Sequence, residues 1–151
     1  AIVSFVNELL APEWTERTFV TAVVGVFDDA EGTAAFCSAG HQAPLRTNRA
    51  GHVEAIESGE GFPLGITAGA TFDCAEVSAN AGESFLFYTD GVTEAANADG
   101  ELFRERRLMD ALATPDGPAD ALAGRIVDAV RAFADEAPQS DDVTLVVARR
   151  L

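Results

Sequence analysis

The chain has 151 residues, 48% of them hydrophobic and 23% charged, which is enough to bury the core of one globular domain. Its 25 acidic residues against 10 basic ones give a formal net charge of −15, which argues against binding nucleic acid or anionic membranes. No apolar run approaches the length of a membrane span. The two cysteines, Cys37 and Cys74, form no CxxC motif, which favours a reduced, cytoplasmic protein.

The first 90 residues are expected to be mainly strand. Apolar residues at helical spacing over 2–10 indicate an amphipathic helix without an N-cap before it, and residues 12–15 should end it. Turn residues then separate runs rich in β-branched and aromatic residues. Strands are predicted over 19–27, 33–38, 45–47, 52–56, 71–77 and 84–89.

The elements predicted after residue 90 are mainly helical. Residues 93–100 predict a short helical turn and a loop, and apolar residues at helical spacing predict helices over Phe103–Leu112 and Ala119–Ala134. The continuous β-branched run Val143–Ala148 predicts a final, fully buried strand. Antiparallel strands followed by two helices and a last strand give an α+β fold class.

Two acidic loops carry the candidate chemistry. Asp90, followed by Gly91, closes the apolar strand over 84–89, and Asp141 and Asp142 open the last one. In an antiparallel pair the end of one strand lies beside the start of its neighbour, so the two loops can meet at one sheet edge. Carboxylates without nearby Cys or His select hard cations such as Mg²⁺ or Mn²⁺. Taken alone, each motif also fits an ordinary turn.

Five short segments appear in a fixed order along the chain: Phe19–Ala22, Ala39–Leu45, Pro63–Gly65, Tyr88–Ala95 and Ser140–Thr144. With these segments the chain resembles the C-terminal half of the SpoIIE/RsbU-type bacterial serine phosphatases, a branch of the metal-dependent protein phosphatase 2C superfamily. This resemblance implies an α-β-β-α sandwich with a two-metal site, and hydrolysis of phosphoserine or phosphothreonine on anti-sigma-factor antagonists of the STAS type.

The resemblance also implies roles for individual residues. Asp90 and Asp141 match metal-binding aspartates of the family, and Mn²⁺ or Mg²⁺ is the expected metal, with two ions in the complete domain. Gly91 would permit the turn below the ion, and Asp142 would support the loop. The segments Gly40-His41 and Pro63-Leu64-Gly65 are assigned loop-shaping roles.

One departure from the family shapes the functional prediction. The family carries further metal ligands in an N-terminal half, and nothing before Phe19 matches that half. We therefore expect residues 1–151 to form a single incomplete phosphatase domain with little activity of its own, which dimerises or pairs with the missing N-terminal half because its strand edges are open. The alternative is a non-catalytic pseudophosphatase or binding module that docks a STAS-type partner.

Overall fold

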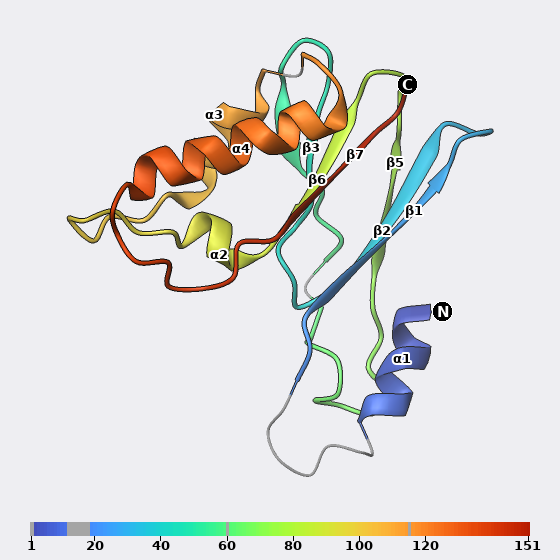
Figure 1. Ribbon diagram of the computed structural model, residues 1–151. Helices are drawn as coiled ribbons and strands as arrows, with labels where there is room; N and C mark the ends of the chain where they lie inside the picture. Colours follow the sequence, from blue (N-terminus) through green and yellow to red (C-terminus); the bar gives the residue numbers. More distant parts are fainter. Residues whose placement is uncertain (1, 12–18, 60, 115) are drawn as a thin grey trace. The chain divides into compact units, whose positions relative to one another are not determined.

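The computed structural model describes residues 2–11, 19–59, 61–114 and 116–151 (Figure 1). The chain divides into two compact units: unit 1 comprises Ala1–Ala43 and Ile56–Asn80, and unit 2 comprises Pro44–Ala55 and Ala81–Leu151. Each unit has its own antiparallel sheet. The helix end expected over 12–15 lies outside the described residues. Within the described ranges, no helix is both long and apolar enough to cross a membrane.

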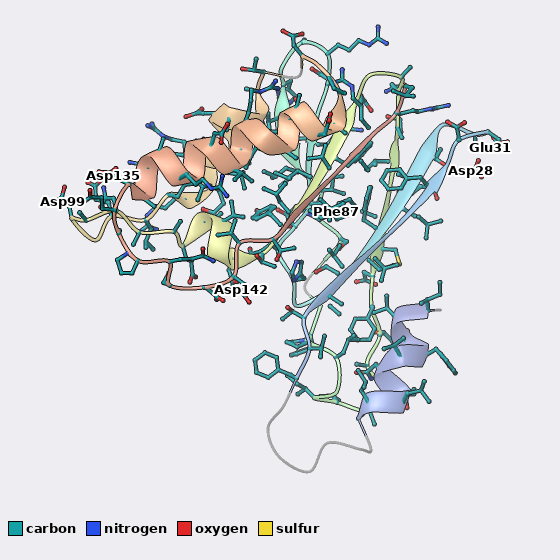
Figure 2. All side chains as sticks on the ribbon, in the orientation of Figure 1. Asp28, Glu31, Phe87, Asp99, Asp135 and Asp142 are labelled. Carbon is teal, nitrogen blue, oxygen red and sulfur yellow. A yellow bond between two sulfur atoms is a disulfide. The ribbon has the colours of Figure 1, made fainter. Side chains whose placement is uncertain are left out.

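Unit 1 contains helix α1 (Ile2–Leu10) and a sheet of three antiparallel strands in the order β1-β2-β5. The hairpin between the first two strands is closed by the Asp28 side chain, which accepts a hydrogen bond from the Glu31 N–H at 3.0 Å (Figure 2). The predicted helix and the first predicted hairpin are confirmed, with strand ends shifted by a few residues. The strands are β1 (Ala22–Asp28), β2 (Thr33–Ala39) and β5 (Cys74–Ser78).

The two cysteines form a disulfide, so the expectation of reduced, isolated thiols was wrong. Strands β2 and β5 pair antiparallel with Cys37 opposite Cys74, and the two Cα atoms lie 4.3 Å apart. This spacing is typical of a non-hydrogen-bonded antiparallel pair, in which facing side chains come closest. The two residues are 37 positions apart in the sequence, and the strand pattern does not tell which strand pairs with β5.

Helix α1 is held to the loop over residues 64–69 by a buried amide. Asn7 is fully buried; its Nδ2 donates to the Thr67 carbonyl at 2.9 Å, and its Oδ1 accepts a hydrogen bond from the Gly65 N–H at 3.0 Å. Leu64, in the same loop, exchanges two backbone hydrogen bonds with Val20. A polar residue therefore lies inside the apolar helical pattern because it satisfies loop backbone groups that would otherwise lack partners.

We expect Asn7→Ala to lower the free energy of unfolding by about 2–3 kcal/mol, because it leaves the Gly65 N–H and the Thr67 carbonyl without their partner. Urea denaturation measures this change. The matched control is Glu8→Ala, which removes one exposed hydrogen bond from the same helix to the Gly69 N–H and should cost less than about 1 kcal/mol. Equal losses in the two variants would contradict the role given to the buried amide.

Unit 2 contains four antiparallel strands in the order β4-β3-β6-β7 and three helices. Figure 1 shows α3 and α4 together on one face of this sheet. The strands are β3 (Leu45–Thr47), β4 (Val53–Ala55), β6 (Ser84–Tyr88) and β7 (Leu145–Arg149). The helices are α2 (Asp90–Thr93), α3 (Arg104–Leu112) and α4 (Ala119–Ala134).

The core of unit 2 lies between this sheet and the two longer helices. The apolar residues predicted at helical spacing point inward, as burial of a single stripe requires. Phe103 belongs to this core, and its ring meets that of Phe133 edge to face with centroids 5.5 Å apart. The Arg107 guanidinium lies 4.5 Å from the Phe133 centroid. The buried helical residues are Leu108, Leu112, Leu122, Ile126 and Val130, packed with Leu86 and Tyr88 of β6.

The α+β fold class is confirmed: antiparallel strands, two C-terminal helices and a final strand are all present. The final strand differs from its prediction in one respect. β7 lies at the end of the strand order, and Val146 is 58% exposed, so β7 is an edge strand and not a fully buried one. The run of β-branched residues reflects strand propensity there and not burial on both faces.

Candidate active site

Strand β6 delivers Asp90 to the end of the unit 2 sheet. The Leu86 and Tyr88 side chains lie in the core, which fixes the strand. Thr89 keeps an extended backbone (φ −90°, ψ 160°) and precedes α2, whose first residue is Asp90. The Asp90 carboxylate is exposed, and its Oδ1 accepts a hydrogen bond from the Gly91 N–H at 3.1 Å. The carboxylate is therefore presented by the first turn of a short helix.

Thr89 joins the two acidic loops. Tyr88 opposite Leu145 is the last pair of the β6–β7 ladder, and beyond it the Thr89 N–H donates to the Thr144 carbonyl at 3.0 Å. The Thr89 hydroxyl donates to the Asp142 carbonyl at 2.9 Å and accepts from the Thr144 N–H at 3.1 Å. The Thr89 side chain thus adds hydrogen bonds beyond the last residue pair of the β6–β7 ladder. These bonds hold the loops of Asp90 and Asp141 together at one sheet edge.

Gly91 allows the two loops to approach closely. A Cβ atom at this position would lie 2.9 Å from the Asp142 carbonyl carbon and 3.4 Å from that of Asp141. The glycine lies in the helical turn of α2 and is not among the glycines with positive φ. The predicted reason for a glycine at position 91 was a sharp turn. The structure gives a different reason, because the facing backbone leaves no space for a side chain.

The donor chemistry of this edge suits a hard divalent cation. Asp90, Asp141 and Asp142 all carry exposed carboxylates, and these oxygen ligands are the kind that Mg²⁺ and Mn²⁺ prefer. Asp141 also shapes its own loop, because its Oδ1 accepts the Asp142 N–H at 2.7 Å. In the part of the chain that the structure describes, no group of three or more His, Cys, Asp or Glu residues is placed to hold a metal ion.

Comparison with known proteins decides the family. A family model for stage II sporulation protein E (SpoIIE) matches residues 1–151, the whole chain. The chain belongs to the SpoIIE family. This membership confirms the resemblance to SpoIIE/RsbU-type phosphatases that the five sequence segments carry.

Three relatives show how much of a SpoIIE-family protein this chain represents. Protein IcfG of Synechocystis sp. is 28% identical over 149 residues, which are 98% of this chain and 23% of that protein. The SiaA-PP2C domain of Pseudomonas aeruginosa shares the fold, with a TM-score of 0.83, 23% identity and coverage of 98% of this chain and 58% of that one. The RsbU and RsbW domains of Rv1364c from Mycobacterium tuberculosis match with a TM-score of 0.67, 28% identity and coverage of 86% and 36%. The chain thus spans under two thirds of each relative.

The two loops assigned a shaping role in the SpoIIE family interlock within unit 1. Gly40 has a φ of 67°, and a Cβ there would lie 2.7 Å from Cγ of Pro63. The His41 ring nitrogen Nδ1 lies 3.1 Å from the Thr21 hydroxyl, and the His41 backbone N–H donates a hydrogen bond to the Ser38 hydroxyl at 3.2 Å. These contacts support the loop-shaping assignment.

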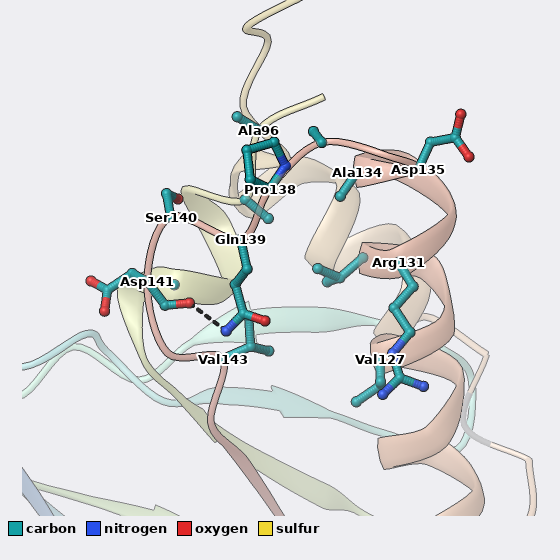
Figure 3. Close-up of a pocket in the computed structure, with 14 residues that line it drawn as sticks. Ala96, Val127, Arg131, Ala134, Asp135, Pro138, Gln139, Ser140, Asp141 and Val143 are labelled. Atoms are coloured by element: carbon teal, nitrogen blue, oxygen red, sulfur yellow. Dashed lines mark hydrogen bonds between the residues drawn. The ribbon is translucent and has the colours of Figure 1, made fainter. Parts of the chain in front are cut away.

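Sequence reasoning missed two residues that hold the acidic loops of this SpoIIE-family chain. One is Thr89, described above. The other is Gln139, whose Nε2 donates to the Asp141 carbonyl at 2.7 Å (Figure 3). A threonine as the last residue of a predicted strand, directly before Asp-Gly, is the available signal for Thr89, because its hydroxyl can replace a ladder partner. Gln139 carries no comparable signal.

Proposed function

We propose that this chain is the C-terminal part of a metal-dependent protein serine/threonine phosphatase domain. The observation that carries the proposal is the junction of β6 and β7, where Thr89 ties the loop of Asp90 to that of Asp141. Membership of the SpoIIE family supports the same reaction class. A junction of this kind holds two carboxylates on a sheet edge with little freedom, which is what a metal site requires.

In this proposal Asp90 and Asp141 would hold Mn²⁺ or Mg²⁺ together with ligands from beyond the described residues. When bound there, the metal would supply Lewis-acid activation of water and neutralise charge on the phosphoryl oxygens. The chain's own residues orient the site: Thr89 fixes the spacing of the loops, Gly91 leaves room for their contact, and the Asp142 carbonyl anchors the second loop. Two carboxylates alone would hold each ion weakly.

The proposed substrate is a phosphorylated anti-sigma-factor antagonist of the STAS type. The resemblance to RsbU-type phosphatases supports it, and one relative, Rv1364c, has both RsbU and RsbW domains. The protein would then act in the regulation of sigma factors, and its proposed cytoplasmic location rests on this role and no longer on reduced cysteines, because Cys37 and Cys74 form a disulfide. Its proposed partners besides substrate are a second copy of the chain or the N-terminal half of the domain, because β1 and β7 are both edge strands.

A non-catalytic docking module for the same STAS-type partner is the second candidate. It is favoured by one observation: the residues that the structure describes bring together no group of three metal-ligating side chains. The two candidates make opposite predictions for metal-dependent turnover in the natural full-length protein, so the same assay separates them.

We expect the full-length protein to release phosphate from a phosphoserine peptide only with Mn²⁺ or Mg²⁺. Asp90→Ala and Asp141→Ala should each lower kcat/KM at least about 100-fold, because several kcal/mol of transition-state stabilisation depends on the bound metal. The control is Asp128→Ala, an exposed carboxylate on α4, which should leave turnover unchanged. Residues 1–151 alone should show little or no activity.

Two results would contradict these expectations for the full-length protein and for residues 1–151. Metal-independent phosphate release by the full-length protein would remove the basis of the metal-dependent reaction. Turnover by residues 1–151 alone that Asp90→Ala abolishes would show that this chain needs no further ligands.

A further inference from the structure

A pocket of about 390 Å³ borders the acidic edge of unit 2. It lies between the C-terminal part of α4 and the segment that leads to β7, and Figure 3 shows its lining residues. Gly91 and Asp141 belong both to this pocket and to the candidate metal edge. Any group that occupies the pocket is therefore an immediate neighbour of a phosphoserine held at that edge.

Part of the pocket wall is apolar. Val127 and Val130 come from α4, Pro138 from the loop after it, and Val143 from the segment before β7. Val130 is only 5% exposed and also belongs to the unit 2 core, so core packing fixes this part of the wall. The apolar part of this wall can hold a hydrophobic side chain of another molecule, while polar residues line the rest of the pocket.

Among the residues that the structure describes, Arg131 is the one basic residue that lines this pocket. Its side chain is exposed, and no hydrogen bond or ion pair joins its guanidinium to any of the residues the structure describes. Asp135 follows one turn later, and Figure 3 shows its carboxylate directed away from the guanidinium. A guanidinium in this state can bind a carboxylate of another molecule in a bidentate manner.

We propose that this pocket is a specificity site for the protein substrate: it holds an apolar side chain close to the phosphorylated serine, while Arg131 pairs with an acidic residue of the same segment. The inference rests on the proposed phosphatase function. It adds a substrate class, namely phosphoserine segments with one apolar and one acidic residue within a few positions of the serine. A substrate side chain in a hydrophobic pocket changes kcat/KM by about 10-fold or more.

The test uses the full-length protein and four phosphoserine peptides that carry leucine or alanine, and glutamate or lysine, near the phosphoserine. The variant Ala134→Trp places a large side chain in the pocket, because Ala134 lines it. Relative to turnover of p-nitrophenyl phosphate, this variant should lower kcat/KM for the leucine peptides at least 10-fold and leave the alanine peptides unchanged. Arg131→Glu should reverse the preference for glutamate over lysine, and Arg131→Lys should retain most of it.

The matched control is Arg106→Glu, which makes the same charge change at an exposed position of α3 outside the pocket and should alter no peptide preference. Equal turnover of all four peptides by the unmodified protein would overturn the proposal, as would equal losses on peptides and p-nitrophenyl phosphate in Ala134→Trp.

The proposed phosphatase function can fail separately. If the full-length protein with Mn²⁺ hydrolyses neither p-nitrophenyl phosphate nor the phosphoserine peptides, that function fails. Fluorescence anisotropy with the labelled leucine–glutamate peptide then tests the pocket alone. The proposal then predicts an affinity loss of at least 10-fold in Ala134→Trp and in Arg131→Glu, and unchanged affinity in both variants overturns it.

Discussion

Replacing Gly91 with alanine is expected to destabilise the protein by about 1–3 kcal/mol and to weaken Mn²⁺ binding at the acidic edge. The added Cβ would lie 2.9 Å from the Asp142 carbonyl carbon, closer than such atoms approach in folded proteins. The obstacle is the backbone of Asp141 and Asp142 and not a flexible side chain, so the strain is relieved only when the loops of Asp90 and Asp141 move apart. Urea denaturation and Mn²⁺ titration by calorimetry measure the two effects.

Gly124 provides the matched control. It lies within α4, and a Cβ there would meet no atom within 4 Å. Alanine is a better helix former than glycine by about 1 kcal/mol, so Gly124→Ala should raise the free energy of unfolding by roughly that amount. The same substitution is thus expected to act in opposite directions at two glycines. A Gly91→Ala variant as stable as the unmodified protein would show that the loops do not pack as closely as the structure indicates.

The elements that could be predicted are those whose signal is local. Helix α4 spans the predicted residues, Ala119–Ala134, because an apolar stripe over Leu122, Ile126 and Val130 runs along it and Gly117-Pro118 comes directly before it. The meeting of the Asp90 and Asp141 loops also follows from a simple rule, since antiparallel neighbours place the end of one strand beside the start of the other.

The features that could not be predicted depend on which strands become neighbours. β5 and β6 follow one another in the sequence but belong to different sheets. The role of Thr89 requires the β6–β7 register to the exact residue, because a shift of one position would turn its hydroxyl to the other face. The apolar run of β7 predicts a strand that is buried on both faces. Composition alone does not reveal that β7 lies at the edge of its sheet, with a neighbouring strand on one side only.

The disulfide is the clearest case of such a non-local feature, and its loss is expected to have the largest effect on stability. Cys37 and Cys74 join the middle strand of the unit 1 sheet to its outer strand β5. The bridge closes a loop of 37 positions, for which the chain-entropy estimate gives about 4 kcal/mol. In a protein of this size that corresponds to a change in Tm of roughly 10 °C.

We therefore expect the Tm of the unmodified protein to fall by roughly 10 °C when a phosphine reductant is added. The double variant Cys37→Ala, Cys74→Ala should have the Tm of the reduced protein, both with and without reductant. The control is Cys37→Ala alone, which leaves one thiol and should match the double variant. Alkylation under native conditions followed by mass spectrometry measures the bond directly. Two thiols that alkylate in the folded, unreduced protein would contradict the pairing of Cys37 with Cys74 and the contribution given to it here.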